Sequence, residues 1–429
     1  MIIVLGDQFG DTGKGKLVDY LSSSASVCAR TNGGANAGHT VSVNNTSYKF
    51  HLLPSATLHK NCQLVLASNV VIDPLKLFEE LQKYKEYDVL DRLFISGEAH
   101  LVPGLYKSLD EQLDNILKIG TTKQGIGPSY EAKAGRYGLR VFDLLDKPSF
   151  IKKYEALFDI TNMPHEGFIS ADDFYRECEF MIPMITDTTM MLLKNPSSVI
   201  EVAHGHMLDI NHGTYPFVTS SSCDVGGVLS SLGVPHQDIK DVIIVTKIYS
   251  TRVGQGEFMT EIHDPELAKK IQTVGHEIGT TTGRVRRVGW MDLPMLVRGI
   301  RMNGCSNVAI FKFDLLEHFD VLKICDYYFD KTSGDILNIW TTDVHINPGK
   351  YSPHYVSFQI QNVKDLNKCK TLGMLIHNPT IDAIVTFLKK HLHTWAGAAI
   401  GYIGVGPNRD EIIDIKGRGP VYHTIENYH

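Results

Sequence analysis

The 429-residue chain lacks any closely spaced or even-numbered set of cysteines. Its seven cysteines are widely separated and form no Cys-x-x-Cys pair. Disulfide frameworks and zinc ribbons need such sets, so we expect reduced thiols in a cytoplasmic protein. No apolar run approaches the length of a membrane span, and the first residues lack the charged and long apolar segments of a signal peptide. We therefore expect no membrane partner.

The chain also lacks a strong excess of charge of one sign. Lys and Arg number 42 against 48 Asp and Glu, which leaves a formal net charge of −6. A weakly acidic chain is a poor candidate for wrapping nucleic acid, although a local basic pocket for phosphate remains possible. A composition of 43% hydrophobic and 21% charged residues excludes disordered, collagen-like and coiled-coil proteins. A globular enzyme is the simplest interpretation.

Short β-branched runs alternate with helical patterns along the chain. Asp73 and Pro74 have the order of an N-cap and a first helical residue, and apolar residues follow at helical spacing. Continuous apolar runs suit strands buried on both faces of a parallel sheet. We expect an α/β fold with a large, mostly parallel central sheet flanked by helices, in one domain over residues 1–429 with a helical insertion at about 150–195. The strands are expected at residues 2–5, 93–96, 199–202, 242–248 and 308–313.

A glycine-rich segment follows the first expected strand. Residues 6–16 read GDQFGDTGKGK, and apolar residues at helical spacing come next. A strand, a glycine-rich turn and a helix together direct backbone N–H groups and a helix N-terminus at a phosphate. Lys14 and Lys16 add positive charge there. The sequence therefore predicts a P-loop-like start.

This segment departs from the usual P-loop motif. Gln8 stands at the position of the first glycine, and Gly15 replaces the hydroxyl residue that normally helps to hold Mg²⁺. The loop carries Asp11 instead, whose carboxylate could bind Mg²⁺, act as a base, or do both. The alternative is a glycine turn with solvated charges, which is about as common for such a short motif.

A second glycine-rich segment favours the catalytic interpretation. Residues 31–40 read TNGGANAGHT and contain three glycines and one histidine. Small residues let a backbone approach a ligand closely, and His39 is suited to act as an acid or as a phosphate donor. A single histidine is more often structural than catalytic. Beside a phosphate loop that carries Asp11, however, His39 would complete an acid–base pair.

These two segments resemble the signatures of the adenylosuccinate synthetase family, which run Gly-Asp-Glu-Gly-Lys-Gly-Lys and Asn-Ala-Gly-His-Thr. Further blocks of the family pattern follow in the same order over nearly the whole chain, which makes a chance resemblance very improbable. The further blocks lie at residues 120–122, 125–128, 138–141, 209–216, 218–221, 249–254 and 281–284.

The resemblance implies a GTP- and Mg²⁺-dependent ligase that joins L-aspartate to C6 of IMP. In the family the residue matched by Asp11 takes the N1 proton of IMP, so that O6 attacks the γ-phosphate of GTP and a 6-phosphoryl intermediate forms. Asp11 would also bind Mg²⁺ together with the carbonyl of Gly38. His39 would bond the β-phosphate and donate a proton to the leaving GDP.

The resemblance also implies three sets of binding residues in this chain. Arg136 would reach the site of a neighbouring subunit in a homodimer, and Asp314 would accept hydrogen bonds from guanine. For GTP the matched residues are Gly10, Gly13, Lys14, Gly15, Lys16, Gly38, Thr40, Arg286, Lys312, Asp314 and Gly406. For IMP they are Asp11, Lys14, Asn36, Gly38, His39, Thr122, Arg136, His204, Thr219 and Arg284, and for aspartate Thr281, Thr282 and Arg284.

Several positions depart from the family pattern and leave alternatives open. His204 stands where the family has a Gln that contacts the purine, so the acceptor could be another 6-oxopurine nucleotide such as GMP or dGMP. A non-catalytic GTP-binding paralogue is a further alternative, against which the retention of Asp11 and His39 argues. The other departures are Thr12, Ala35, Lys123, Gln124 and Gly404.

Overall fold

The computed structural model describes residues 1–279 and 283–416, and its centre is an 11-stranded sheet. All neighbouring strands pair in parallel except β17 and β18, so the expected mostly parallel sheet is confirmed. The order is β18 (Ile412–Asp414), β17 (Ala399–Gly404), β13 (Asn307–Phe311), β10 (Asp241–Lys247), β1 (Ile2–Gly6), β9 (Ser198–Gly205), β2 (Val27–Gly33), β5 (Gln63–Ile72), β6 (Leu93–Ser96) and β8 (Ile185–Thr186), with β7 (His100–Leu101) beside β5.

Strand β1 lies in the middle of this sheet, between β9 and β10. Its residues Ile3, Val4 and Leu5 are fully buried, as expected for a continuous apolar run that is covered on both faces. The glycine-rich segment leaves the carboxyl end of β1, which is the edge of a parallel sheet where ligands commonly bind. The sheet thereby places this segment beside the ends of β9 and β10.

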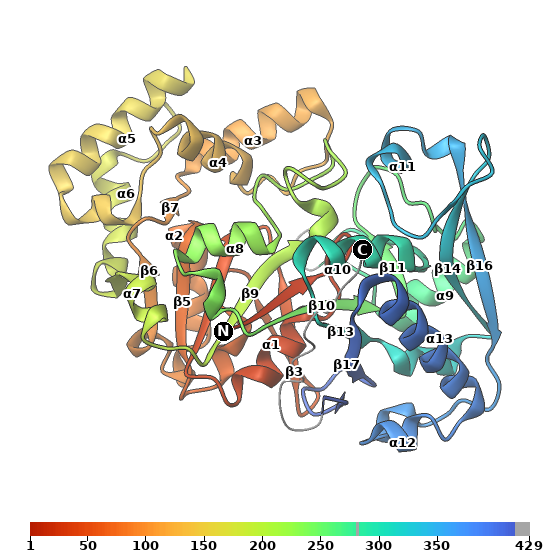
Figure 1. Cartoon of the computed structure of the whole chain (residues 1–429). Helices are drawn as coiled ribbons and strands as arrows, with labels where there is room; N and C mark the ends of the chain where they lie inside the picture. Colours follow the sequence, from red (N-terminus) through yellow and green to blue (C-terminus); the bar gives the residue numbers. More distant parts are fainter. Residues whose placement is uncertain (280–282, 417–429) are drawn as a thin grey trace.

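Helices cover the sheet, and one helical group lies at an end of the molecule (Figure 1). In α2 the Asp73 carboxylate accepts the N–H of Lys76 at 3.3 Å and Pro74 is the first residue, as predicted. The helices are α1 (Lys14–Ser22), α2 (Pro74–Lys83), α3 (Gly104–Leu117), α4 (Ile126–Gly135), α5 (Lys147–Thr161), α6 (Ala171–Cys178), α7 (Thr188–Leu193), α8 (Val225–Leu232), α9 (Pro265–Gly275), α10 (Leu293–Asn303), α11 (Thr342–Ile346), α12 (Leu372–Leu375) and α13 (Pro379–Ala396).

The region expected to be a helical insertion, 150–195, is mostly helical. Helix α5 begins slightly earlier than expected, at Lys147, and α6 and α7 follow. The same region also supplies strand β8, which pairs with β6 at an edge of the central sheet. The region is therefore anchored to the sheet as well as built from helices.

A second, five-stranded sheet was not expected from the sequence and lies at the opposite end from α5 and α6 (Figure 1). Most of its pairs are antiparallel. It contains β11 (Tyr249–Arg252), β12 (Arg287–Asp292), β14 (Val321–Asp330), β15 (Ile336–Leu337) and β16 (Tyr351–Gln359). A separate hairpin consists of β3 (His39–Val43) and β4 (Thr46–Phe50).

Two expected strands were predicted too long. Strand β10 ends at Lys247 and not at residue 248, and β13 ends at Phe311 and not at residue 313. The second end has a clear cause, because Lys312 adopts a left-handed backbone with φ 64° and extended pairing cannot continue through it. Both strand ends therefore bring a lysine to the edge where the glycine-rich segment lies.

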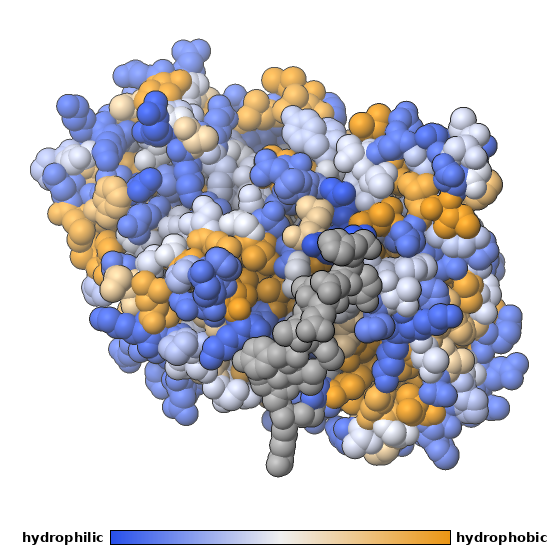
Figure 2. Space-filling model, in the orientation of Figure 1, coloured by the Kyte–Doolittle hydropathy of each residue, from blue (hydrophilic) through white to orange (hydrophobic). Residues whose placement is uncertain are grey.

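Both hydrophobic and hydrophilic side chains reach the surface. Hydrophobic and hydrophilic residues are interspersed on the face seen in Figure 2. Within the described part of the chain, no helix combines the length and the apolar character needed to cross a bilayer.

Candidate active site at the carboxyl edge of the central sheet

The glycine-rich segment connects β1 to α1 and packs closely against two other segments. Gly13 caps α1 with φ 83°, and a Cβ there would lie 2.6 Å from Cδ2 of Phe311. A Cβ on Gly15 would lie 2.9 Å from Oγ of Ser55 and 3.1 Å from Cβ of His39. Glycine is thus required at residue 15 because His39 packs against the first turn of α1. The two glycine-rich segments of the sequence meet at this point.

Asp11 lies in the loop with a left-handed backbone, φ 52°, and its side chain is 38% exposed. Its Oδ2 lies 2.6 Å from Nη1 of Arg286 and 3.5 Å from Nζ of Lys247. Both cations are buried, so they compensate the Asp11 charge on the protein side while the carboxylate keeps an exposed side. A general base or a metal ligand needs both a compensated charge and an accessible oxygen.

Glu277 lies on the far side of the same two cations. Its carboxylate is 1% exposed and lies 2.9 Å from Nζ of Lys247 and 2.8 Å from Nη1 of Arg286, and it accepts the hydroxyl of Tyr249. Burial alone would raise the pKa of Glu277, but the two cations lower it below its ordinary value. Two carboxylates therefore share two cations, and Glu277 is the buried one.

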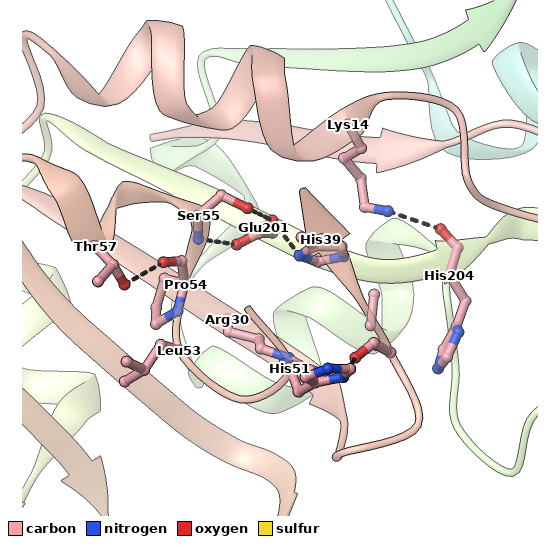
Figure 3. A network of polar contacts seen from close by, with 12 residues as sticks. Lys14, Arg30, His39, His51, Leu53, Pro54, Ser55, Thr57, Glu201 and His204 are labelled. Atoms are coloured by element: carbon pink, nitrogen blue, oxygen red, sulfur yellow. Dashed lines mark hydrogen bonds and ion pairs between the residues drawn. The ribbon is translucent and has the colours of Figure 1, made fainter. Parts of the chain in front are cut away.

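His39 is held by a second buried carboxylate, Glu201 (Figure 3). Its Nδ1 lies 2.6 Å from Oε1 of Glu201, which also accepts the hydroxyl of Ser55 at 2.6 Å, while Oε2 accepts the Ser55 N–H at 2.8 Å. Burial opposes the charge, yet His39 and Ser55 hold the pKa of Glu201 at about 2. Glu201 is therefore a carboxylate that fixes the proton on Nδ1 and leaves Nε2 for a ligand. Burial lowers the pKa of His39, and Glu201 opposes that effect.

Lys14 lies beside this pair, also in Figure 3. It is buried, and its Nζ donates to the carbonyl of His204 at 3.2 Å. The left-handed backbone of His204, φ 65°, directs that carbonyl to the lysine. Burial lowers the pKa of Lys14, with Glu201 acting in the opposite direction. The lysine ammonium thus faces the same space as His39.

His204 is in contact with Asn36, as the predicted IMP set requires. Its Nε2 lies 3.2 Å from Nδ2 of Asn36. Burial, with Lys14 and Arg30 nearby, lowers the pKa of His204 to about 3, so the ring is neutral at physiological pH. Since the amide nitrogen donates, Nε2 accepts and Nδ1 carries the proton. His204 is then a hydrogen-bond donor through Nδ1.

Lys16 is bonded to a late loop of the chain. Its Nζ donates to the carbonyls of Gly406 and Glu411, at 2.6 and 2.9 Å. The same late loop is tied to α1 by Nε of Arg409, which donates to Oδ2 of the fully buried Asp19 at 2.8 Å. The helix that follows the glycine-rich loop therefore fixes the segment around Gly406.

Asp314 has an unsatisfied acceptor, as a guanine site requires. Its Oδ1 is buried and lacks a hydrogen-bond donor among the described residues. Such an atom costs free energy until a ligand supplies an N–H. Lys312, two residues earlier, donates to the carbonyl of Gly275 at 3.2 Å. Phe311, which contacts Gly13, brings this segment up to the glycine-rich loop.

The structure also describes further predicted residues outside the two glycine-rich segments. Arg284 is exposed and its Nη2 donates to the carbonyl of Gly120 at 3.2 Å, which joins its segment to the one that carries Thr122. Thr219 is half-buried, and its N–H donates to the carbonyl of Leu208. Arg136 is exposed at the end of α4. Thr281 and Thr282 lie outside the described residues, and Gly10, Gly38 and Thr40 lie in the two glycine-rich segments.

Sequence reasoning missed the residues that hold the catalytic candidates in place. These are Ser55, Glu201, Lys247, Tyr249 and Glu277. Glu201 is separated from His39 by more than 100 residues of chain, and Glu277 is separated from Asp11 by more than 200. No local spacing connects such pairs. A local signal exists only for Glu201, which interrupts the apolar run of β9.

The donor set fits a magnesium ion that binds with a nucleotide. Among residues 1–279 and 283–416 no three His, Cys, Asp or Glu side chains are grouped to hold a metal by themselves. Mg²⁺ in nucleotide sites is held by one or two carboxylates together with phosphate oxygens and water. Asp11 is such a single carboxylate on the glycine-rich loop, and Gly38 precedes His39 in the second glycine-rich segment.

Comparisons with known proteins agree with these motifs. The family model described as adenylosuccinate synthetase matches residues 3–413. The adenylosuccinate synthetase of Chlorobaculum parvum is 39% identical over 430 residues, with 96% of each chain covered. A fully ligated adenylosuccinate synthetase from Plasmodium falciparum has a TM-score of 0.89 and 35% identity, over 96% of this chain and 99% of that one.

A more distant structure shares the fold alone. It is a cyanophage S-2L succinoaminodeoxyadenylate synthetase bound to dGMP and to dATP as energy donor. The likeness has a TM-score of 0.61 at 18% identity and covers 96% of this chain and 94% of that one.

Proposed function

Because the chain belongs to the adenylosuccinate synthetase family, we propose that it joins L-aspartate to C6 of IMP at the expense of GTP. The products are adenylosuccinate, GDP and phosphate. The observation that carries the proposal is that the His39–Glu201 pair packs against Gly15, in the first turn of the helix that follows the glycine-rich loop of Asp11. The two alternatives, a GMP- or dGMP-specific enzyme and a non-catalytic GTP-binding paralogue, are not favoured by the comparisons.

In the first step, Asp11 accepts the proton from N1 of IMP while O6 attacks the γ-phosphorus of GTP. The O6–P bond forms, the bond from phosphorus to the β,γ-bridging oxygen breaks, and GDP leaves. His39, oriented by Glu201, donates to the β-phosphate as negative charge develops there. This step is needed because a purine O6 is a very poor leaving group until it is phosphorylated.

In the second step, the amino group of aspartate attacks C6, the C6–N bond forms, the C6–O6 bond breaks, and inorganic phosphate leaves with the proton that the nitrogen gives up. Lys14, which is buried, is proposed to compensate the charge on the transferred phosphoryl group. Asp11 and the carbonyl of Gly38 would hold Mg²⁺, which neutralises phosphate charge when bound. Arg286 and Lys247 both contact Asp11 through its Oδ2, so they compete with a bound cation for the charge of this carboxylate.

The other roles are proposed on the same residue-by-residue match. Arg284, Thr281 and Thr282 bind aspartate, and an arginine is apt because its planar fork matches a carboxylate. Arg136 acts in the site of the second subunit of a homodimer, which is consistent with its exposure at the end of α4. The seven cysteines are all free, and we propose the cytoplasm as the compartment.

A phosphate-release screen tests the reaction directly. It crosses IMP, GMP and dGMP with GTP and ATP, each with and without L-aspartate. We expect release only with IMP, GTP and aspartate together. Turnover of guanine nucleotides in place of IMP would contradict the proposed acceptor, and binding without any turnover would support the paralogue instead.

The guanine site can be tested through Asp314. In Asp314→Asn an amide donor faces the guanine amino group, so we expect the KM for GTP to rise by about 100-fold while xanthosine triphosphate becomes a better substrate. The KM for IMP should remain within about twofold. Steady-state kinetics with both triphosphates measure this, and an unchanged KM for GTP would remove Asp314 from the site.

A further inference from the structure

The four charges around Asp11 form an arrangement that the reaction scheme does not use in full. The two negative side chains are Asp11 and Glu277, and the two positive side chains are Arg286 and Lys247. Three of the four side chains are nearly inaccessible, at 1% to 7%, while Asp11 is 38% exposed. The cations are shared between an acid that faces the site and one that does not.

The backbone explains why Glu277 and Arg286 face each other. The N–H of Arg286 donates to the carbonyl of Glu277 at 3.0 Å, and Ile278 forms an antiparallel bridge with Val285. These residues make the base of the segment that carries Thr281, Thr282 and Arg284. Lys247 comes from the end of β10 and is also fixed by Oγ1 of Thr251 at 2.8 Å. The buried acid therefore joins the central sheet to the base of the proposed aspartate loop.

We propose that Glu277 is a positioning residue that draws Arg286 and Lys247 away from Asp11, so that Asp11 can exchange them for the nucleotide-bound divalent cation. The proposal rests on the proposed function, in which Asp11 binds that cation. When Glu277 is ionised, the two negative and two positive side chains balance one another. Arg286 and Lys247 then still have Glu277 as a partner after Asp11 has bound the divalent cation. With Glu277 neutral, both cations would have Asp11 as their nearest carboxylate and would compete with the incoming cation.

Removing the negative charge of Glu277 and removing the positive charge of Lys247 should therefore change the affinity for the divalent cation in opposite directions. We expect Glu277→Gln to weaken Mn²⁺ binding in the presence of GDP by about tenfold, because it leaves an uncompensated positive charge at Asp11. We expect Lys247→Met to tighten it by about threefold, because one competitor is removed. Raising the Mg²⁺ concentration should restore kcat in Glu277→Gln.

Electron paramagnetic resonance of free Mn²⁺, with the full-length chain and GDP, measures these affinities. Glu261→Gln is the matched control, because Glu261 pairs with Arg287, the residue next to Arg286, with Oε1 at 2.7 Å from its Nε. It should leave Mn²⁺ affinity unchanged. Tyr249→Phe removes one donor to Glu277 but no charge, so it provides a milder variant if Glu277→Gln does not fold, and its affinity should change by less than about threefold.

The outcomes separate the two proposals. If Asp11→Asn binds Mn²⁺ as well as the wild type, the proposed metal site itself fails. If Asp11→Asn loses Mn²⁺ but folded Glu277→Gln binds it like the wild type, only the role of Glu277 fails. A loss of Mn²⁺ affinity in both Glu277→Gln and Lys247→Met would also overturn the proposed role of Glu277. If these residues only supported the structure, both substitutions would lower the affinity. A change of tenfold or more in Tyr249→Phe would contradict the charge argument.

Discussion

Asp11→Asn should lower kcat by about 10⁴-fold while leaving the fold intact. The carboxylate is proposed both to accept the N1 proton of IMP and to bind the divalent cation, and an amide can do neither well. Asparagine is the suitable replacement because Asp11 has a φ of 52°, a left-handed conformation that asparagine adopts readily and alanine does not. Phosphate release measures turnover, and thermal unfolding checks the fold.

Asp88→Asn is the control for this substitution. Asp88 also has a left-handed backbone, φ 54°, and pairs with a lysine, Lys60, at 2.8 Å, but on the exposed surface. We expect wild-type turnover from it, because exposed ion pairs contribute little. Retention of activity in Asp11→Asn would show that another group takes the N1 proton.

Glu201→Gln should lower kcat by about 100- to 1000-fold, since His39 would lose the carboxylate that fixes its proton on Nδ1 and stabilises the protonated ring. The KM for IMP should change little, because Glu201 is fully buried and acts through His39. The ratio of these two effects, measured by steady-state kinetics, distinguishes orientation of His39 from a general loss of structure.

Glu201→Gln should also change the way in which the free energy of unfolding depends on pH. The pKa of Glu201 is about 2 in the fold, below its ordinary value of 4.5, so the ionised form stabilises the protein above pH 4.5. That contribution disappears as the pH falls from 4.5 towards 2, and Glu201→Gln should lack it. Urea unfolding at several pH values tests this.

Glu80→Gln is the matched control for Glu201→Gln. Glu80 is also buried and accepts backbone N–H groups, from Leu52 at 3.1 Å and Leu53 at 2.9 Å, but it does not contact His39. It should lose stability by about 1–3 kcal/mol and keep its kcat. Equal losses of kcat in both variants would assign Glu201 a structural role only.

Much of the fold could be predicted because its signals are local. The apolar run of β1 is long enough to specify a strand buried on both faces, and Asp73 followed by Pro74 specified the start of α2. The second sheet was missed because strands such as β16, in which only Tyr351 is buried, lack the continuous apolar run of a strand covered on both faces. Strand ends such as Lys312 were also missed, because a left-handed lysine has no sequence signature.

For the candidate site, local sequence patterns were enough to identify the residues that can carry the chemistry. Asp11, Lys14 and His39 stand out because they lie in glycine-rich loops, where backbone and side chains can approach a phosphate. The tertiary structure alone decided which buried acids serve them. Glu201 and Glu277 come from distant segments, and a buried carboxylate acquires its role only from the cations and donors that folding brings around it.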